Sequence, residues 1–158
     1  LLLFLLFCSV LLVYGCRYRW SDLRRKNIPM KKVQVAFSNA IKRRDCRCMI
    51  KDYEPCSGNL ECSHYFTQGA NPSLMFYPPN AYAQCASHHW KHHNRIECSE
   101  MYKNRLLEMG KKKELEKMEV LRSKYIKYSD ELKLEIIKLC ETDSLTELKQ
   151  LIESKLLN

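Results

Sequence analysis

Residues 46–62 read CRCMIKDYEPCSGNLEC and residues 85–98 read CASHHWKHHNRIEC, and together they hold six of the nine cysteines in the chain. The spacing of these six is C-x-C-x7-C-x5-C-x22-C-x12-C. Such density is typical of small exported domains, which use disulfide bonds because their hydrophobic core is small. We therefore predict a disulfide-stapled module over residues 46–98.

The N-terminal stretch supports export. Residues 1–15 carry no charge and are almost entirely apolar. That length suits the apolar region of a signal peptide, roughly 7–15 residues, whereas a membrane span needs about 20. Val13 and Gly15 fit the small residues that precede a cleavage point. We expect a secreted, extracellular protein, with an uncleaved anchor in a secretory-pathway membrane as the alternative.

Cleavage after Gly15 would remove Cys8 and leave an even number of cysteines, as a complete disulfide framework requires. The pairing pattern does not follow from the spacing. We expect only that Cys16 and Cys140 pair with each other, because both lie outside the module. The predicted half-cystines are Cys16, Cys46, Cys48, Cys56, Cys62, Cys85, Cys98 and Cys140.

Positive charge is concentrated before the module. The chain has a net charge of +9, and residues 16–45 hold ten Lys and Arg residues against two acidic ones. A basic segment of this kind favours anionic surfaces. We expect it to bind a sulfated glycan or acidic lipid, while nucleic acid is not the expected partner. The predicted contact residues are Arg24, Arg25, Lys26, Lys31, Lys32, Lys42, Arg43 and Arg44.

Helical periodicity is visible on both sides of the module. Val33, Phe37 and Ile41 recur every four residues, which indicates an amphipathic helix that packs on the module or lies on a membrane or partner. Residues 99–158 are also helical in pattern, and the short join near Asp143 predicts an antiparallel hairpin of the last two helices. The expected fold is an α-rich small disulfide-stabilised protein, divided into residues 1–15, 16–45, 46–98 and 99–158.

A loop within the module is a candidate contact surface. Residues 69–84 combine glycine, asparagine and three prolines with large apolar side chains, which indicates a long loop around one short extended segment. Exposed aromatic residues there would make strong protein contacts. We expect Phe76 and Tyr77 to be buried in the small core of the module, and we name Phe76, Tyr77 and Tyr82 as candidate partner-binding residues for the alternative in which they are exposed.

Four histidines in residues 85–98 offer a different chemistry. On a helix, His88 and His92 share one face and His89 and His93 share another, and this spacing can chelate Zn²⁺ or Cu²⁺. Cys85 or Cys98 could complete such a site. Cys46-x-Cys48 and the nearby Cys62 and His64 also have zinc-like spacing, but in an exported protein we expect disulfides there instead. No glutamate directly follows His88, so the helical zinc-peptidase pattern is absent.

The sequence thus favours a secreted or membrane-tethered, cysteine-rich binding protein for an extracellular protein partner, with a basic polyanion-binding segment and no enzymatic activity. The alternative is a zinc-binding protein or a metal-dependent lumenal enzyme that uses the four histidines.

Overall fold

The computed structural model describes residues 27–157. The predicted signal segment, Cys16, and the basic residues Arg24, Arg25 and Lys26 lie outside the described residues. Within residues 27–157, no helix combines the length and apolar character that a bilayer crossing requires. The elements, in chain order, are α1 Met30–Asp45, β1 Leu60–His64, the short 3₁₀ helices η2 Pro72–Leu74 and η3 Pro78–Asn80, β2 Ala81–Cys85, α2 Ala86–Asn94, α3 Ile96–Glu108, α4 Lys112–Leu121, α5 Asp130–Glu141 and α6 Leu145–Leu157.

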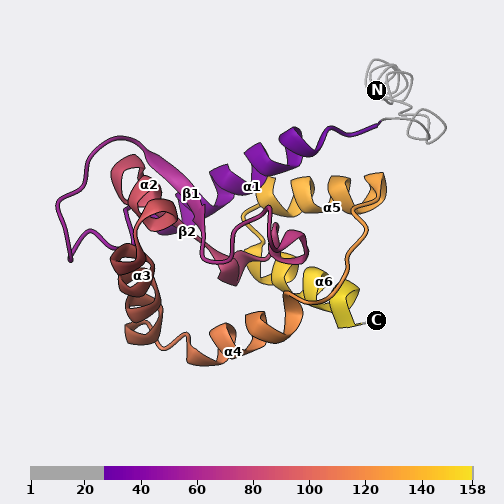
Figure 1. Cartoon of the computed structure of the whole chain (residues 1–158). Coiled ribbons are helices and arrows are strands. Elements are labelled where there is room, and N and C mark those ends of the chain that lie inside the picture. The colour runs from indigo at the N-terminus through magenta and orange to yellow at the C-terminus, as the bar shows by residue number, and fades with distance from the viewer. Residues whose placement is uncertain (1–26, 158) are drawn as a thin grey trace, which may run out of the picture.

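Helix α1 packs into the protein rather than extending from it. Its apolar stripe is fully buried and includes the predicted Val33, Phe37 and Ile41. The helix contacts both strands on one side and α5 on the other, as Figure 1 shows. The segment predicted to be a basic arm is therefore, from Met30 onward, part of the core structure.

The two strands form an antiparallel hairpin in which Leu60 pairs with Cys85 and His64 pairs with Ala81. Every residue of β2 is buried, because α1 and α2 both contact this strand. The connecting loop carries η2 and η3 and is ordered by Asn80. The Asn80 side chain accepts a hydrogen bond from the Phe66 amide and donates to the carbonyls of Phe66 and Leu74.

Helix α2 begins directly after β2 and contacts both strands, so residues 60–94 form a compact strand–loop–strand–helix unit (Figure 1). Helix α3 follows and contacts α2, and α4 and the C-terminal helices continue from there around the loop, where α4 contacts η2 and α6 contacts η3. Ser129 caps α5 by accepting from the Leu132 amide, and α5 contacts α6 across a join of three residues. The predicted α-rich fold and its C-terminal pair of contacting helices are thus present, together with a small sheet that the sequence did not indicate.

The predicted disulfide framework is not supported. All seven cysteines within residues 27–157 are free thiols. They are spread over the fold: Cys140 is buried on α5, Cys98 is buried on α3, and Cys46 is exposed at the end of α1. A continuous core runs from α1 to α6, so this fold buries far more apolar surface than a small stapled module.

The loop aromatics are buried, as expected for a small core, and this corrects their candidacy as partner-binding residues. Phe76 and Tyr77 are completely buried and Tyr82 is 6% exposed. Phe76 packs edge-on against Phe37, while the Tyr77 hydroxyl donates to Glu153 on α6. Tyr82 lies beneath the Arg44 guanidinium. These side chains hold the loop between α1 and the C-terminal helices and are not available to a partner.

Candidate functional site

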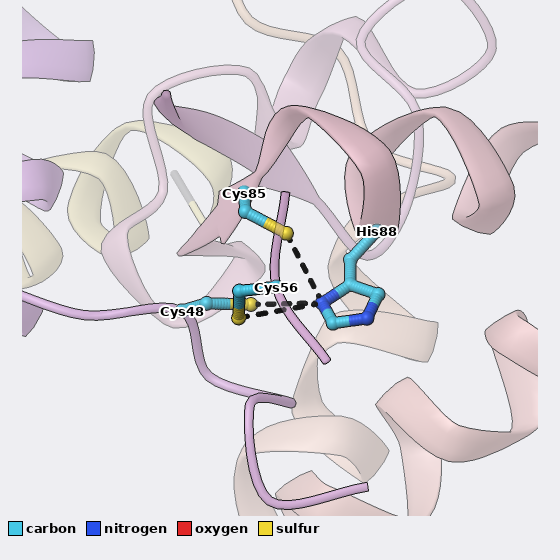
Figure 2. Close-up of side chains that lie close together, drawn as sticks. All are labelled: Cys48, Cys56, Cys85 and His88. Atoms are coloured by element: carbon cyan, nitrogen blue, oxygen red, sulfur yellow. Dashed lines mark hydrogen bonds between the residues drawn. The ribbon is translucent and has the colours of Figure 1, made fainter. Parts of the chain in front are cut away.

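Three cysteines and one histidine converge where the hairpin meets α2. The sulfur atoms of Cys48, Cys56 and Cys85 and the Nδ1 atom of His88 all lie within 4.8 Å of one another. The distances from His88 Nδ1 are 3.2 Å to the Cys48 and Cys85 sulfurs and 3.9 Å to the Cys56 sulfur. Figure 2 shows the imidazole edge directed at all three sulfurs. We call these four residues the Cys3His centre.

The Cys3His centre fits zinc. Tetrahedral Zn²⁺ binds sulfur at about 2.3 Å and imidazole nitrogen at about 2.0–2.1 Å, which places sulfur and nitrogen about 3.5 Å apart. The three separations in this chain bracket that value. Three thiols and one imidazole supply four protein ligands, which is the complete set of a structural zinc site.

Local structure brings these four side chains together from three segments. Cys48 and Cys56 lie in the turn between α1 and β1, Cys85 ends β2, and His88 lies in the first turn of α2. The turn approaches α2 so closely that a Cβ atom on Gly58 would lie 2.8 Å from the Ala86 Cβ. Gly58 also has a φ of +80°, which favours glycine, so both the backbone conformation and the close approach to Ala86 require glycine at this position.

Backbone groups prepare the centre for a cation. Burial opposes ionisation of Cys85, but the backbone amides of His88 and Ser57 donate to its sulfur, and the net effect lowers the pKa of this thiol. Burial lowers the pKa of His88, which keeps the ring neutral and its lone pair available. On the far side of the ring, His88 Nε2 lies 3.6 Å from a Glu54 carboxylate oxygen, and Lys91 pairs with the same carboxylate. This separation is too long for a hydrogen bond, and His88 Nε2 is buried without a hydrogen-bond partner in the described part of the chain.

The sequence interpretation weighed these residues incorrectly. It paired Cys48 with Cys46 as a possible zinc pair, but the Cys46 sulfur contacts the Arg43 carbonyl instead. Cys98 is buried but is not part of the centre. The available signal was Cys85-x2-His88, a short pair of ligands at a strand–helix junction. The inference of export gave disulfides preference over zinc at every cysteine.

The four candidate histidines divide among three environments. His88 belongs to the Cys3His centre, whereas His92 on the same helical face is buried, with Nε2 3.2 Å from the His64 carbonyl. His89 and His93 face outward together, and their Nε2 atoms lie 3.0 Å apart. Glu61 on β1 contacts His89 Nδ1 at 2.6 Å. Both predicted pairs share a helical face, but the ring nitrogens of His88 and His92 face different groups: His88 Nδ1 faces the three cysteines and His92 Nε2 faces the His64 carbonyl.

His89 and His93 line a pocket of about 260 Å³ together with Cys62, His64, Thr67 and Gln68. We call this the histidine pocket. His64, at the end of β1, is 4% exposed and has a fixed orientation. Its Nε2 donates to the Met75 carbonyl at 2.9 Å, so Nδ1 is the unprotonated nitrogen, which accepts from Gln68 at 3.1 Å. Burial lowers the pKa of His64 to about 4, so the ring is neutral.

The described basic residues have unequal surroundings. Arg43 bonds Asp143 and the Cys140 carbonyl, and Arg44 bonds Asp45 and the Ala81 carbonyl, so both tie parts of the fold together. Lys31 and Lys32 are exposed on α1, while Lys42 is half-buried. Within residues 27–157, Arg43 and Arg44 are exposed but paired with carboxylates, whereas Lys31, Lys32 and Lys42 form no salt bridge.

A comparison of the chain with protein-family models, with curated proteins and with solved structures finds no match. The geometry of the Cys3His centre and the histidine pocket is therefore the basis for the function proposed below.

Proposed function

We propose that this chain is a metal-dependent hydrolase whose reaction centre is the histidine pocket, and that the Cys3His centre holds a structural zinc ion. The observation that carries the proposal is the environment of His64. This histidine is buried, and its hydrogen bond to the Met75 carbonyl sets its tautomer. It lines one pocket with His89 and His93, two outward-facing histidines that can bind a metal.

The Cys3His centre supports the structural half of the proposal. Four protein ligands leave no position open for a substrate, so a zinc ion bound there acts on stability. It would join the turn before β1 to the start of α2. His89 and His93 lie on the same helix as His88, so that ion would also fix the helix that carries them.

The histidine pocket supports the catalytic half. Two imidazoles at i, i+4 spacing, with Glu61 beside His89, supply donors for a divalent cation and leave further positions for water or substrate. His64 Nδ1 is the general base, and the attacking water takes the place of the Gln68 amide that donates to this nitrogen in the structure. Gln34 on α1 donates to the Gln68 side-chain oxygen, so Gln68 is held beside His64 from both sides.

The reaction is hydrolysis of an ester. A water molecule gives its proton to His64 Nδ1 while its oxygen bonds to the electrophilic centre of the ester. The bond from that centre to the leaving oxygen breaks, and the leaving oxygen keeps the electron pair. His89 and His93 would hold a divalent cation that would balance this charge, and the leaving oxygen takes a proton from solvent. His64 then returns its proton to solvent.

The test is a hydrolysis assay on zinc-loaded protein with bis(p-nitrophenyl) phosphate and added Mg²⁺, Mn²⁺ or Ni²⁺. We expect turnover that requires a divalent cation. His64→Gln keeps a donor for the Met75 carbonyl but has no basic nitrogen, and it should lose about 10²–10⁴-fold in rate. His89→Ala and His93→Ala should each require more metal for half-maximal rate.

Trp90→Ala is the matched control, because Trp90 is exposed on the same helix and outside the histidine pocket. Its rate and metal requirement should equal those of the parent. The proposal is wrong if no cation supports turnover, or if folded His64→Gln is as active as Trp90→Ala.

A further inference from the structure

A second, larger pocket opens beside the histidine pocket. It has a volume of about 450 Å³ and lies between α1 and β1. Cys62, His64 and Gln68 line both pockets, so the two pockets share a wall at these side chains. A molecule lying in the larger pocket therefore reaches the side chain of the proposed general base. We call this pocket the α1 groove.

The α1 groove is positively charged. Lys31 and Lys42 line it, and the other described lining residues are uncharged or histidine: Gln34, Val35, Phe37, Ser38, Asn39, Cys62, His64 and Gln68. No carboxylate within residues 27–157 lines the groove to neutralise these lysines. Their charge favours an anionic occupant, and Gln34, Ser38 and Asn39 add neutral hydrogen-bonding groups.

The spacing of the lysines indicates the shape of that occupant. Lys31 and Lys42 are eleven residues apart on one helix, which corresponds to a rise of about 16 Å. A single small anion does not need two cations so far apart. An extended molecule that carries several anionic groups can contact both.

The chemistry of the site indicates phosphate as the anionic group. Cleavage of a glycosidic bond in a sulfated glycan normally uses a pair of carboxylic acids, whereas the histidine pocket combines imidazoles with the single carboxylate Glu61. Histidines, a divalent cation and nearby lysines suit displacement at phosphorus, where the main task is to balance charge on phosphate oxygens.

We propose that the α1 groove is the substrate-binding site of this hydrolase, and that Lys31 and Lys42 hold phosphate groups of an extended phosphodiester while His64 faces the bond to be cleaved. This inference rests on the proposed function for its reaction and on the groove for its substrate. Lys31 and Lys42 are positioning residues, because neither lines the histidine pocket.

The test measures binding separately from turnover. Fluorescence anisotropy of a labelled single-stranded oligonucleotide is recorded with zinc-loaded His64→Gln protein, with and without Lys31→Gln and Lys42→Gln. An exposed ion pair contributes about 1.4–5-fold in affinity, so the doubly substituted groove should bind about 2–25-fold more weakly. The slope of log affinity against log salt should fall by about 1.4, which corresponds to two released phosphate contacts.

Lys32→Gln is the matched control, because Lys32 is exposed beside Lys31 but lines a different pocket, toward α5. It should change the affinity and slope by less than half as much. Inorganic polyphosphate is a second probe. If polyphosphate competes with the oligonucleotide for binding and is not itself hydrolysed, the groove recognises the phosphate groups rather than the bases or sugars. If Lys32→Gln and the Lys31/Lys42 variant lose the same amount of affinity for the oligonucleotide, the assignment of the α1 groove as the binding site is wrong. The assignment of a phosphodiester is also wrong if the groove binds heparin in preference to the oligonucleotide.

The outcomes also separate this inference from the proposed function. If the parent protein hydrolyses bis(p-nitrophenyl) phosphate but the groove variant binds the oligonucleotide normally, the groove assignment fails and the hydrolase stands. If the groove variant loses binding while no substrate is hydrolysed in any cation, the hydrolase fails and the groove stands as a phosphate-binding surface.

Discussion

The two ends of the β1–β2 hairpin differ in how completely they enclose their metal-binding side chains. At the Leu60–Cys85 end, four donors from three segments converge with separations suited to zinc. At the His64–Ala81 end, one buried histidine shares a pocket with two outward-facing histidines. A closed set of ligands favours stability, whereas an incomplete set leaves room for substrate. One short helix, α2, serves both ends because His88 and His89 point to different sides of it.

The largest expected effect concerns the closed end. Cys85→Ser, or an excess of zinc chelator, should remove a binding free energy that in zinc peptides reaches about 10–16 kcal/mol. Even a loss of about 5 kcal/mol would lower the Tm by about 10–20 °C in a chain of this size. A reductant without chelator should leave the Tm unchanged. Thermal melts followed by circular dichroism provide the measurement.

Cys46→Ser is the control for that experiment, because Cys46 is exposed and outside the Cys3His centre. Its Tm should match the parent. Unfolding by reductant, with no response to chelator, would restore the disulfide framework predicted from the sequence.

A smaller effect is expected at the open end. Because burial lowers the pKa of His64 from 6.5 to about 4, the unfolded chain binds more protons than the folded protein between these values. The stability that comes from neutral His64 is therefore complete above pH 6.5 and is lost as the pH falls toward 4, by about 3 kcal/mol. Urea unfolding across this range should show a flatter acid limb for His64→Gln than for the parent.

Acid also releases zinc, but both proteins share the Cys3His centre, so the difference between the two profiles isolates His64. Superimposable profiles would contradict the buried, neutral state of this histidine.

The remaining predictions compare three glycines, namely Gly58 before β1, Gly69 after β1 and Gly110 between α3 and α4. Gly58→Ala combines a positive φ with a close approach to Ala86 and should cost about 2–4 kcal/mol. Gly110→Ala has the positive φ without a close neighbour and should cost about 1 kcal/mol. Gly69→Ala, in the loop beyond His64, meets open space without a positive φ and should be nearly neutral. Urea denaturation can rank the three, and equal costs would show that the approach to Ala86 is not tight.

Much of the helical structure could be predicted because it depends on neighbouring residues. The spacing of Val33, Phe37 and Ile41 defines the buried face of α1, and Ser129 caps α5 from the position directly before it. The separation of His88 from His89 onto different faces of α2 also follows from helical geometry alone. These features need no knowledge of distant parts of the chain.

The partners of the cysteines depended on tertiary structure, because a thiol has the same local sequence signal whether it binds zinc, forms a disulfide or fills a core. Cys48 meets Cys85 only because the hairpin pairs Leu60 with Cys85 and returns the chain to the start of α2. The sequence marked His64 only as a neighbour of Cys62. Its place in a pocket with His89 and His93 follows from packing of α2 on β1, and this packing, with the groove beside α1, sets the chemistry proposed for the protein.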